Sequence, residues 1–432
     1  MPTTQNSLTP FPASKKPTVL VLGGGIVGVT TAYFLLRRGF KVTIVERAAN
    51  VGDLTSRGNA GLVSAGCSQP WNAPGVPLAV LKTWGRSDSP YLFRLSAFPG
   101  IIPWATRFLL HCKADLYRQS CRSSVELVSY SLSQYKTVVQ DEGLAFDRQN
   151  KGVLKYFEDA NALKNDAQST AVLAEAGLDY QVLNAGQIVD LEPALAPHRS
   201  RIAGGIFFPQ DESGDSSLFA KALLKRCLEL GSEVLFETEV TDIVARNGMV
   251  QHIATSRGNM VADNYVLCLG PSAAGLAARI GIRLPIYPVK GYSVTIDTGG
   301  QIPLPRIAFL DWGRKIAVTP FGNRIRAAGT AEFCGFNLDP TPARLAALHK
   351  NLVELFPELH GLTAVTNWAG LRPVTPDGMP VLGKSPIANL LLNAGHGPQG
   401  WGLSCGCAAI LADVMSGRQP DIALDAFSYT RL

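Results

Sequence analysis

The chain has 432 residues, of which 46% are hydrophobic and 17% charged, a composition that indicates a compact protein of two or three domains and excludes a disordered or fibrous one. Lysine and arginine number 40 against 34 for aspartate and glutamate, and the net charge of +6 is spread without long runs of one sign, so no nucleic-acid partner is expected. No apolar stretch reaches the roughly 18 residues that a membrane-spanning helix needs.

The first residues, 1–16, lack the apolar middle of a secretory signal and are predicted to form a flexible tail. A β-α-β pattern follows. Residues 18–22 (TVLVL) are typical of a buried strand, residues 26–38 of a helix, and residues 41–45 (KVTIV) of a second strand. We therefore expect a cytoplasmic protein whose fold begins with a β-α-β unit.

Glycines fill the turn between the first strand and the helix in the pattern G-x-G-x-x-G, at Gly23, Gly25 and Gly28. The first permits a tight turn, the second lets the backbone approach a pyrophosphate, and the third lets the helix pack close to the strand. Glu46 ends the second strand, where an acid accepts hydrogen bonds from ribose hydroxyls. The pattern predicts a dinucleotide site; a glycine-rich structural turn is the alternative.

Downstream of this unit the chain alternates between helical and strand patterns. Residues 91–200 are mainly helical, residues 204–270 return to an α/β pattern, and residues 282–335 alternate apolar and polar side chains as an antiparallel sheet does. A last strand and helix flank the loop GHGPQGWG at 395–402. We expect helices over residues 123–142, 161–176, 217–230 and 403–415, and strands over 152–157, 232–239, 241–246, 265–269 and 390–394.

The dinucleotide-binding material is thus divided into three segments by two insertions. An NAD domain normally completes its strands without long interruptions, whereas FAD domains of the glutathione-reductase type collect them from distant segments, so the arrangement favours FAD. We predict an α/β fold (α+β overall), with a discontinuous Rossmann domain for FAD and a substrate domain built on a mixed or antiparallel β-sheet. The FAD-binding domain is assigned to residues 17–90, 200–281 and 366–432, and the substrate-binding domain to residues 91–199 and 282–365.

The cysteines and histidines give no sign of a metal site. Eight cysteines are scattered along the chain, most of them in the apolar surroundings of buried, reduced thiols. Cys405 and Cys407 are one residue apart, which matches neither the redox nor the zinc spacing of a C-x-x-C pair. The six histidines form no H-x-x-H or H-E-x-x-H pattern, so no metal is expected.

Further motifs are spread from Thr18 to the C-terminus: VLGGGIVGVTTAYFL, TSRGNAGLVSAG with PWNAPGVP, PQDESGD, YPVKGYSVTI, KIAVTPFGNRIRAAGTAE, WAGLRPVTPDGMPVLG and LLLNAGHGPQGWGLSCG. Together they resemble the FAD-dependent amine and amino-acid oxidoreductases of the D-amino-acid oxidase superfamily, and most closely the small-subunit type bacterial D-amino-acid dehydrogenases. The resemblance covers nearly the whole chain and implies FAD as the cofactor.

The resemblance also implies a reaction. A D-amino acid would lose its Cα hydrogen as hydride to flavin N5, giving a 2-oxo acid and ammonia after hydrolysis, and the electrons would pass to a quinone, an electron-transfer protein or a dye. Three alternatives stay open: a dehydrogenase of D-proline or D-hydroxyproline, an oxygen-using oxidase, and a flavin-binding subunit that is inactive without a partner. The oligomeric state is left undefined.

Three residues are expected to act on the substrate. The resemblance implies that Arg372, in GLRPVTPDG, pairs with the substrate carboxylate, for which a guanidinium fork is suited. Tyr292 is a candidate for a second carboxylate contact, with core packing as the alternative. His396 is a candidate catalytic or positioning group, and Lys290 lies either near flavin N5 or in solvent.

The cofactor is expected to contact the glycine turn, the small-residue segment TSRGNAGLVSAG and the loop before the last helix. Small side chains there let the flavin lie against backbone, and N–H groups at a helix start stabilise the negative charge of the reduced ring. The predicted cofactor residues are Gly23, Gly25, Ile26, Val27, Gly28, Glu46, Arg47, Ser56, Asn59, Ala60, Gly61, Leu62, Val240, Gly270, Arg372, Gly395, His396, Gly397, Gln399, Gly400 and Trp401.

The stretch 91–110 (YLFRLSAFPGIIPWATRFLL) is strongly apolar. It is expected to form a packed wall of the substrate domain. The alternative is a partly exposed patch that touches the inner face of the plasma membrane and delivers electrons to a quinone.

Overall fold

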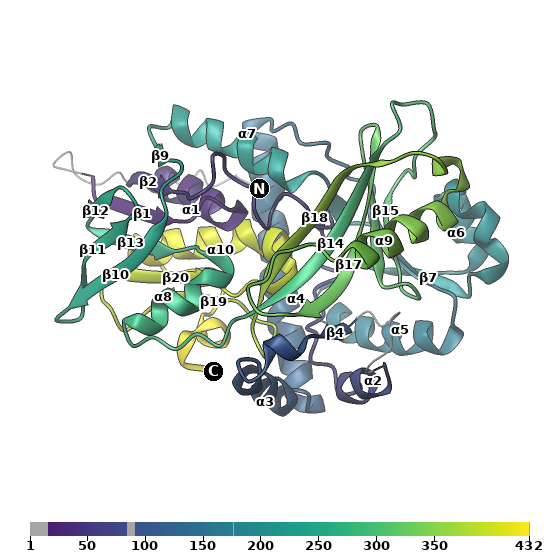
Figure 1. Ribbon diagram of the computed structural model, residues 1–432, viewed down its shortest axis with the longest axis horizontal. Helices are drawn as coiled ribbons and strands as arrows, with labels where there is room; N and C mark the ends of the chain where they lie inside the picture. The colour runs from purple at the N-terminus through teal and green to yellow at the C-terminus, as the bar shows by residue number, and fades with distance from the viewer. Residues whose placement is uncertain (1–15, 84–90, 176, 432) are drawn as a thin grey trace, which may run out of the picture.

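A six-stranded sheet organises the half of the protein that contains the glycine-rich turn (Figure 1). The computed structural model describes residues 16–83, 91–175 and 177–431, so nearly all of the predicted tail lies outside the described residues, as does Ala176. The strand order is β19 (Val381–Lys384), β20 (Leu390–Ala394), β13 (Asn264–Leu267), β1 (Thr18–Leu22), β2 (Lys41–Val45) and β9 (Glu233–Leu235). All pairs are parallel except β19 with β20, and three distant parts of the chain supply the strands, as predicted.

Both faces of this sheet are covered. On β1, Val19 and Val21 pack into one apolar core and Leu20 and Leu22 into another, because successive side chains of a strand point to opposite faces. The first core holds side chains of α1 (Ile26–Arg37), α4 (Ala114–Glu142), α7 (Ser216–Glu229) and α10 (Gly400–Met415). The second holds side chains of β10 (Val240–Arg246), β11 (Met249–Thr255) and α8 (Ala273–Arg279); β10 and β11 form a small sheet with β12 (Gly258–Met260).

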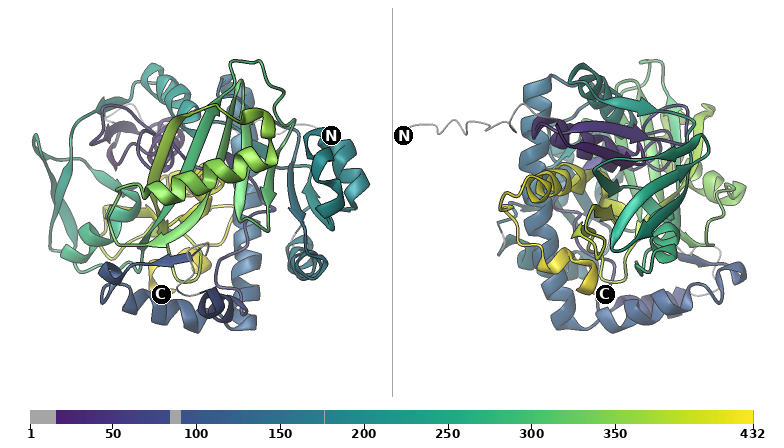
Figure 2. Two further views of the ribbon diagram at one scale, coloured as in Figure 1. Left: turned by 45° about the vertical axis from the view of Figure 1, so that its right-hand side comes forward. Right: turned by 90° about the vertical axis from the view of Figure 1, so that its left-hand side faces the viewer.

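A larger mixed sheet builds the other half. Its order is β18 (Ala364–Val374), β14 (Tyr287–Asp297), β17 (Arg324–Phe333), β16 (Ile316–Phe321), β15 (Ala308–Asp311), β5 (Val153–Phe157), β7 (Gly204–Phe208) and β6 (Gln181–Leu183), with β4 (Tyr91–Phe93) beside β17. Only β15 with β5 and β17 with β4 pair in parallel, which agrees with the predicted mixed sheet. The helix α9 (Pro342–Leu355) lies across the outer face (Figure 2).

The remaining described strands and α-helices connect the two halves or flank them. They are β3 (Leu62–Val63) paired with β8 (Glu212–Ser213), and the helices α2 (Val76–Thr83), α3 (Ile102–His111), α5 (Ala160–Ala174) and α6 (Ala185–Leu191). None of the described helices is both long and apolar enough to cross a membrane.

The division between the halves differs from the predicted domain boundaries. Both β7, at 204–208, and β18, at 364–374, belong to the larger sheet, although residues 200–281 and 366–432 were assigned to the FAD domain. The long helix α4, assigned with residues 91–199, packs on α10, where Gly406 N–H donates to Ser131 Oγ at 2.9 Å. The sequence pattern identified the elements but not the neighbours that they acquire on folding.

Three element boundaries also moved. Helix α10 starts at Gly400, three residues before the predicted start, directly after a 3₁₀ turn at 397–399. Helix α4 starts at Ala114, with Asp115 in its first turn, where a negative charge is favourable. The strand predicted over 232–239 is reduced to β9, because Glu237 adopts a left-handed backbone with φ 50° that ends the extended run.

Candidate active site

A cavity of about 1630 Å³ lies between the two halves. It is larger than most sites for one small ligand, which are about 300–1,000 Å³. Its wall combines the β1–α1 turn, the segment 52–62, parts of α2, α3 and α5, the strands β16 to β18, and the start of α10. The cavity therefore has room for a dinucleotide and a substrate side by side.

The three glycines of the β1–α1 turn have distinct roles. Gly23 has φ +105°, and a Cβ there would lie 2.6 Å from the Cys268 carbonyl oxygen. A Cβ at Gly28 would overlap the carbonyl oxygen of Gly23, so this glycine permits close packing and does not line the cavity. At Gly25, by contrast, the nearest protein atom to a Cβ would be Ser56 Oγ at 3.9 Å. The open space at Gly25 belongs to the cavity, as the phosphate-binding prediction requires.

Glu46 is held in place at the end of β2. Its side chain is 5% exposed, and its carboxylate accepts hydrogen bonds from the N–H groups of Gly24, at 2.6 Å, and Ala48, at 2.7 Å. Each carboxylate oxygen keeps a lone pair after these contacts, so Glu46 can still accept hydrogen bonds from ribose hydroxyls in the cavity.

The small-residue segment is ordered by its own polar groups. Ser56 Oγ accepts a hydrogen bond from the Ile26 N–H at 3.2 Å, at the start of α1. Asn59 Oδ1 accepts from Gly61 N–H at 2.9 Å, and Thr319 Oγ1 of β16 donates to the Ala60 carbonyl at 2.7 Å. The segment thus ties the two halves together along the cavity and is no free surface loop.

The loop before α10 forms part of the cavity wall. His396 Nε2 and Trp401 Nε1 are buried and have no hydrogen-bond partner among the described residues, and both side chains line the cavity. Burial lowers the pKa of His396 to about 4, so its imidazole is neutral at pH 7. Gly395 was predicted to contact the cofactor, and this prediction is wrong because Gly395 does not line the cavity. A Cβ there would lie 2.7 Å from Thr375 Cγ2, and the φ of +76° allows the turn at this position.

Arg372 projects from β18 into the cavity. Its Nη1 donates to the Thr330 carbonyl at 2.9 Å, and its guanidinium carbon lies 6.0 Å from the Trp71 ring centroid. It forms no ion pair with a carboxylate of the described residues, and desolvation lowers its pKa to about 10, which leaves it charged at neutral pH. A guanidinium has five donors, so most of its capacity is free for a planar anion.

Tyr292 is wrong as a predicted substrate contact. Its side chain is fully buried beneath α9, and its hydroxyl donates to Glu332 and, at 3.0 Å, contacts Thr341. The neighbouring Gly291 points to the opposite face of β14, where the Arg372 guanidinium lies over it. Lys290 lies on the same face of β14 as Tyr292. Its side chain is buried and its ammonium donates to Asn337 Oδ1 at 3.1 Å, so Lys290 is neither at the flavin position nor in solvent.

Apart from Gly28, Gly395 and Tyr292, every residue predicted for the site lines the cavity. The structure brings together Gly23, Gly25, Ile26, Val27, Glu46, Arg47, Ser56, Asn59, Ala60, Gly61, Leu62, Val240, Gly270, Arg372, His396, Gly397, Gln399, Gly400 and Trp401.

Two groups of cavity residues were not among the predicted site residues. One is an aromatic wall near Arg372, formed by Trp71, Tyr91, Phe93, Trp104 and Phe333. Of these, Tyr91, Phe93 and Trp104 lie in the apolar stretch 91–110, which was expected to form a packed wall of the substrate domain. Trp104 donates from Nε1 to the Val374 carbonyl at 2.8 Å. The other is a charged end formed by Lys155, Asp166, Trp312 and Lys315. A signal for the second group existed, because Lys155 interrupts the buried strand pattern of β5.

Comparisons with known proteins agree with this geometry. A family model described as DAO, FAD dependent oxidoreductase, matches residues 18–414. The chain is 39% identical over 413 residues to D-amino acid dehydrogenase of Bradyrhizobium diazoefficiens (96% of this chain, 98% of that protein) and 40% identical over 404 residues to the protein of the same name from Granulibacter bethesdensis (94% and 97%). The crystal structure of glycine oxidase from Geobacillus kaustophilus superposes with a TM-score of 0.73 at 25% identity, covering 97% of this chain and 100% of that chain.

The protein is therefore an oxidoreductase with a Rossmann-type nucleotide-binding half. It belongs to the family of FAD dependent oxidoreductases, and FAD is its cofactor. The cavity fits this group: Gly25 and Ser56 would hold the diphosphate at the start of α1, Glu46 would hold the ribose, and the loop with His396 and Trp401 lines the same cavity.

Proposed function

We propose that the protein oxidises D-amino acids to 2-oxo acids and ammonia and passes the electrons to a quinone. The observation that carries the proposal is Arg372, a charged guanidinium without an ion-pair partner among the described residues, in the cavity of an FAD dependent oxidoreductase. Two relatives that match nearly the whole chain bear the name D-amino acid dehydrogenase, which supports this substrate class.

The residues of the chain bind and orient the substrate. Arg372 takes the carboxylate through two parallel hydrogen bonds, which fixes the position of Cα. The aromatic wall of Trp71, Tyr91 and Phe333 keeps water away from this end of the cavity. His396 stays neutral, so it can exchange a hydrogen bond without adding positive charge. FAD, when bound, supplies the acceptor for the hydride that leaves Cα.

The quinone assignment is supported by exposed apolar side chains beside the cavity. Leu81 of α2 is 71% exposed, Leu110 of α3 is 55% exposed, and Leu95 is 91% exposed. Helices α2 and α3 lie at the lower edge of the molecule in Figure 1, and other residues of both helices line the cavity. We propose that this apolar surface rests on the inner face of the plasma membrane, where a lipid-soluble acceptor can approach FAD.

The test is an anaerobic substrate screen of the purified holoenzyme. D-Alanine and D-proline, each with its L-enantiomer, are added while the visible absorbance of the flavin is followed, and turnover is then measured with a quinone analogue and with oxygen. Bleaching by D-alanine, with turnover on the quinone analogue and little on oxygen, is the expected result. Stronger bleaching by D-proline identifies a cyclic-amine dehydrogenase, and turnover on oxygen an oxidase. A flavoprotein that no D-amino acid bleaches contradicts the proposal and favours a subunit that needs a partner.

A further inference from the structure

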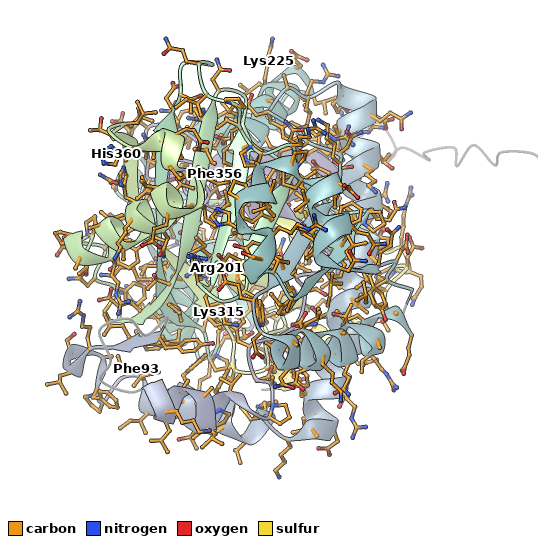
Figure 3. All side chains as sticks on the ribbon, turned by 90° about the vertical axis from the view of Figure 1, so that its right-hand side faces the viewer. Phe93, Arg201, Lys225, Lys315, Phe356 and His360 are labelled. Carbon is orange, nitrogen blue, oxygen red and sulfur yellow. The ribbon has the colours of Figure 1, made fainter. Side chains whose placement is uncertain are left out.

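The charged end of the cavity is used by no step of the proposed reaction. Lys155 comes from β5, Asp166 from α5, and Trp312 and Lys315 from the turn between β15 and β16. Figure 3 labels Lys315 just above α5 on the side of the molecule that faces the viewer. Residues far apart in the sequence thus meet at one end of the substrate space.

The charges at this end do not cancel. Lys155 Nζ and Asp166 Oδ2 are 2.9 Å apart and both side chains are buried, so they neutralise each other. Lys315 forms no ion pair with a carboxylate of the described residues; its ammonium lies 3.3 Å from the centroid of the Trp312 ring. Lys155 lies on the same ring, 4.9 Å from the centroid. Asp311 also lines the cavity, but its carboxylate is paired with Arg314 at 2.6 Å. The net charge offered to a ligand here is therefore positive, and it belongs to Lys315.

Lys315 lies one strand away from Thr330, the residue that the Arg372 guanidinium contacts. The guanidinium of Arg372 donates to the carbonyl of Thr330 on β17, and the preceding Gly329 pairs with Ile316 at the start of β16, next to Lys315. Both cations line the same cavity, Arg372 from β18 and Lys315 from the turn that leads into β16. A molecule with two carboxylates can therefore meet one cation at each of its ends.

We propose that Lys315 binds the side-chain carboxylate of an acidic D-amino acid, of the size of D-glutamate, while Arg372 binds the main-chain carboxylate. Trp312 packs against the Lys315 ammonium and holds it at the cavity wall. This inference names the substrate class within the proposed function and rests on it. D-Glutamine has the same shape as D-glutamate without the charge, so the two compounds isolate the contribution of Lys315.

The experiment compares kcat/KM of the holoenzyme for D-glutamate and D-glutamine, with D-alanine as the test of the proposed function itself. The wild-type protein is expected to prefer D-glutamate, and Lys315→Met to lower the D-glutamate to D-glutamine ratio by about tenfold, the change expected for one charged hydrogen bond. Lys315→Arg should keep most of the preference, because it keeps the charge. Lys350→Met, on the exposed face of α9, is the matched control and should leave the ratio unchanged.

The outcomes separate the two hypotheses. Oxidation of D-alanine together with an equal D-glutamate to D-glutamine ratio in wild type and Lys315→Met overturns the role of Lys315 and leaves the proposed function standing. A wild-type enzyme that prefers D-glutamine also overturns it, without any variant. If wild type oxidises no D-amino acid, the proposed function itself fails. Visible absorbance of each variant verifies that it holds FAD, and Lys315→Gln replaces Lys315→Met if the latter does not fold.

Discussion

The guanidinium of Arg372 lies over Gly291, where a Cβ would overlap its Nη1, Cζ and Nη2 atoms. The missing side chain on β14 is what lets an arginine from β18 cross a strand and reach the Thr330 carbonyl on β17. Gly291 does not touch the substrate, yet it sets the position of the group that does.

Gly291→Ala should displace Arg372 without unfolding the sheet. The methyl group forces the guanidinium aside, and a misplacement of about 1 Å in a binding group costs up to about 100-fold in rate. We expect kcat/KM for the D-amino acid to fall about 10- to 100-fold while FAD stays bound, measured by steady-state kinetics and visible absorbance. The control is Gly275→Ala on α8, where a Cβ meets nothing within 4 Å. Unchanged kinetics in Gly291→Ala would rule out this positioning role.

Arg372→Ala should raise KM by roughly 100-fold or more, because two charged hydrogen bonds to the substrate carboxylate are lost. FAD should remain bound, since the nucleotide contacts lie on the other half of the protein. Arg372→Lys keeps the charge but loses the planar fork, so its KM should lie between that of the wild type and that of Arg372→Ala. Loss of flavin with normal substrate kinetics would contradict the assignment of Arg372 to the substrate.

Gly25→Val and Gly28→Val should fail in different ways. Gly25 has a backbone that other residues adopt, φ −66° and ψ 176°, and its Cβ would point into open space, so Gly25→Val should fold but lose FAD. A side chain at Gly28 would overlap the Gly23 carbonyl, so Gly28→Val should destabilise the fold itself. Circular dichroism and flavin content measure the two effects. A Gly25→Val protein that retains FAD would show that the diphosphate binds elsewhere.

The preference for D-glutamate should decrease as the pH rises. Desolvation lowers the pKa of Lys315 to about 8, partly offset by Asp166 and Asp311 and reinforced by Lys155. A lysine with a lowered pKa is charged below pH 8 and neutral above it, so the attraction for a carboxylate is present at pH 7 and lost by pH 9 to 10. The D-glutamate to D-glutamine ratio of kcat/KM should fall over this range, and in Lys315→Met it should stay flat.

Membrane contact should depend on the exposed leucines of α2 and α3. Replacing Leu81 and Leu110 together by aspartate should abolish co-sedimentation with anionic phospholipid vesicles, because two charges replace apolar side chains at the contact. The dye-coupled rate should be unaffected, since neither residue lines the cavity. Val261→Asp, at a site 75% exposed on the opposite half, is the control. Equal sedimentation of all three proteins would argue against a membrane contact here.

Much of the nucleotide site could be predicted from the sequence because its signals are local. The spacing of Gly23, Gly25 and Gly28 and the acid at Glu46 fix a turn, a helix start and a strand end within one β-α-β unit. Arg372 was found through its motif, but Gly291, which makes room for it, lies about 80 residues away on another strand.

The errors arose where the outcome depends on which face of a strand is buried. Tyr292 and Gly291 are neighbours, and a register shifted by one residue would exchange their roles. The alternating pattern of β14 gives no indication of which side meets the cavity, since both sides are buried. Lys155 and Lys315 are brought together because β5 and β15 pair in parallel. Such a contact between distant segments cannot be predicted from a local sequence pattern.

The central sheet also has consequences for biosynthesis. The partner strands of β1 are β2 and β13, and near its first residue Thr18 Oγ1 donates to Asp263 Oδ2, 245 positions further along. At about 5–20 residues per second on the ribosome, β1 is synthesised roughly 10–50 s before β13, and longer before β20. During this interval the glycine turn exists without the sheet that supports it. Nascent chains stalled before β13 should therefore depend on chaperones, and the nucleotide can be captured only after β13 and β20 have been made.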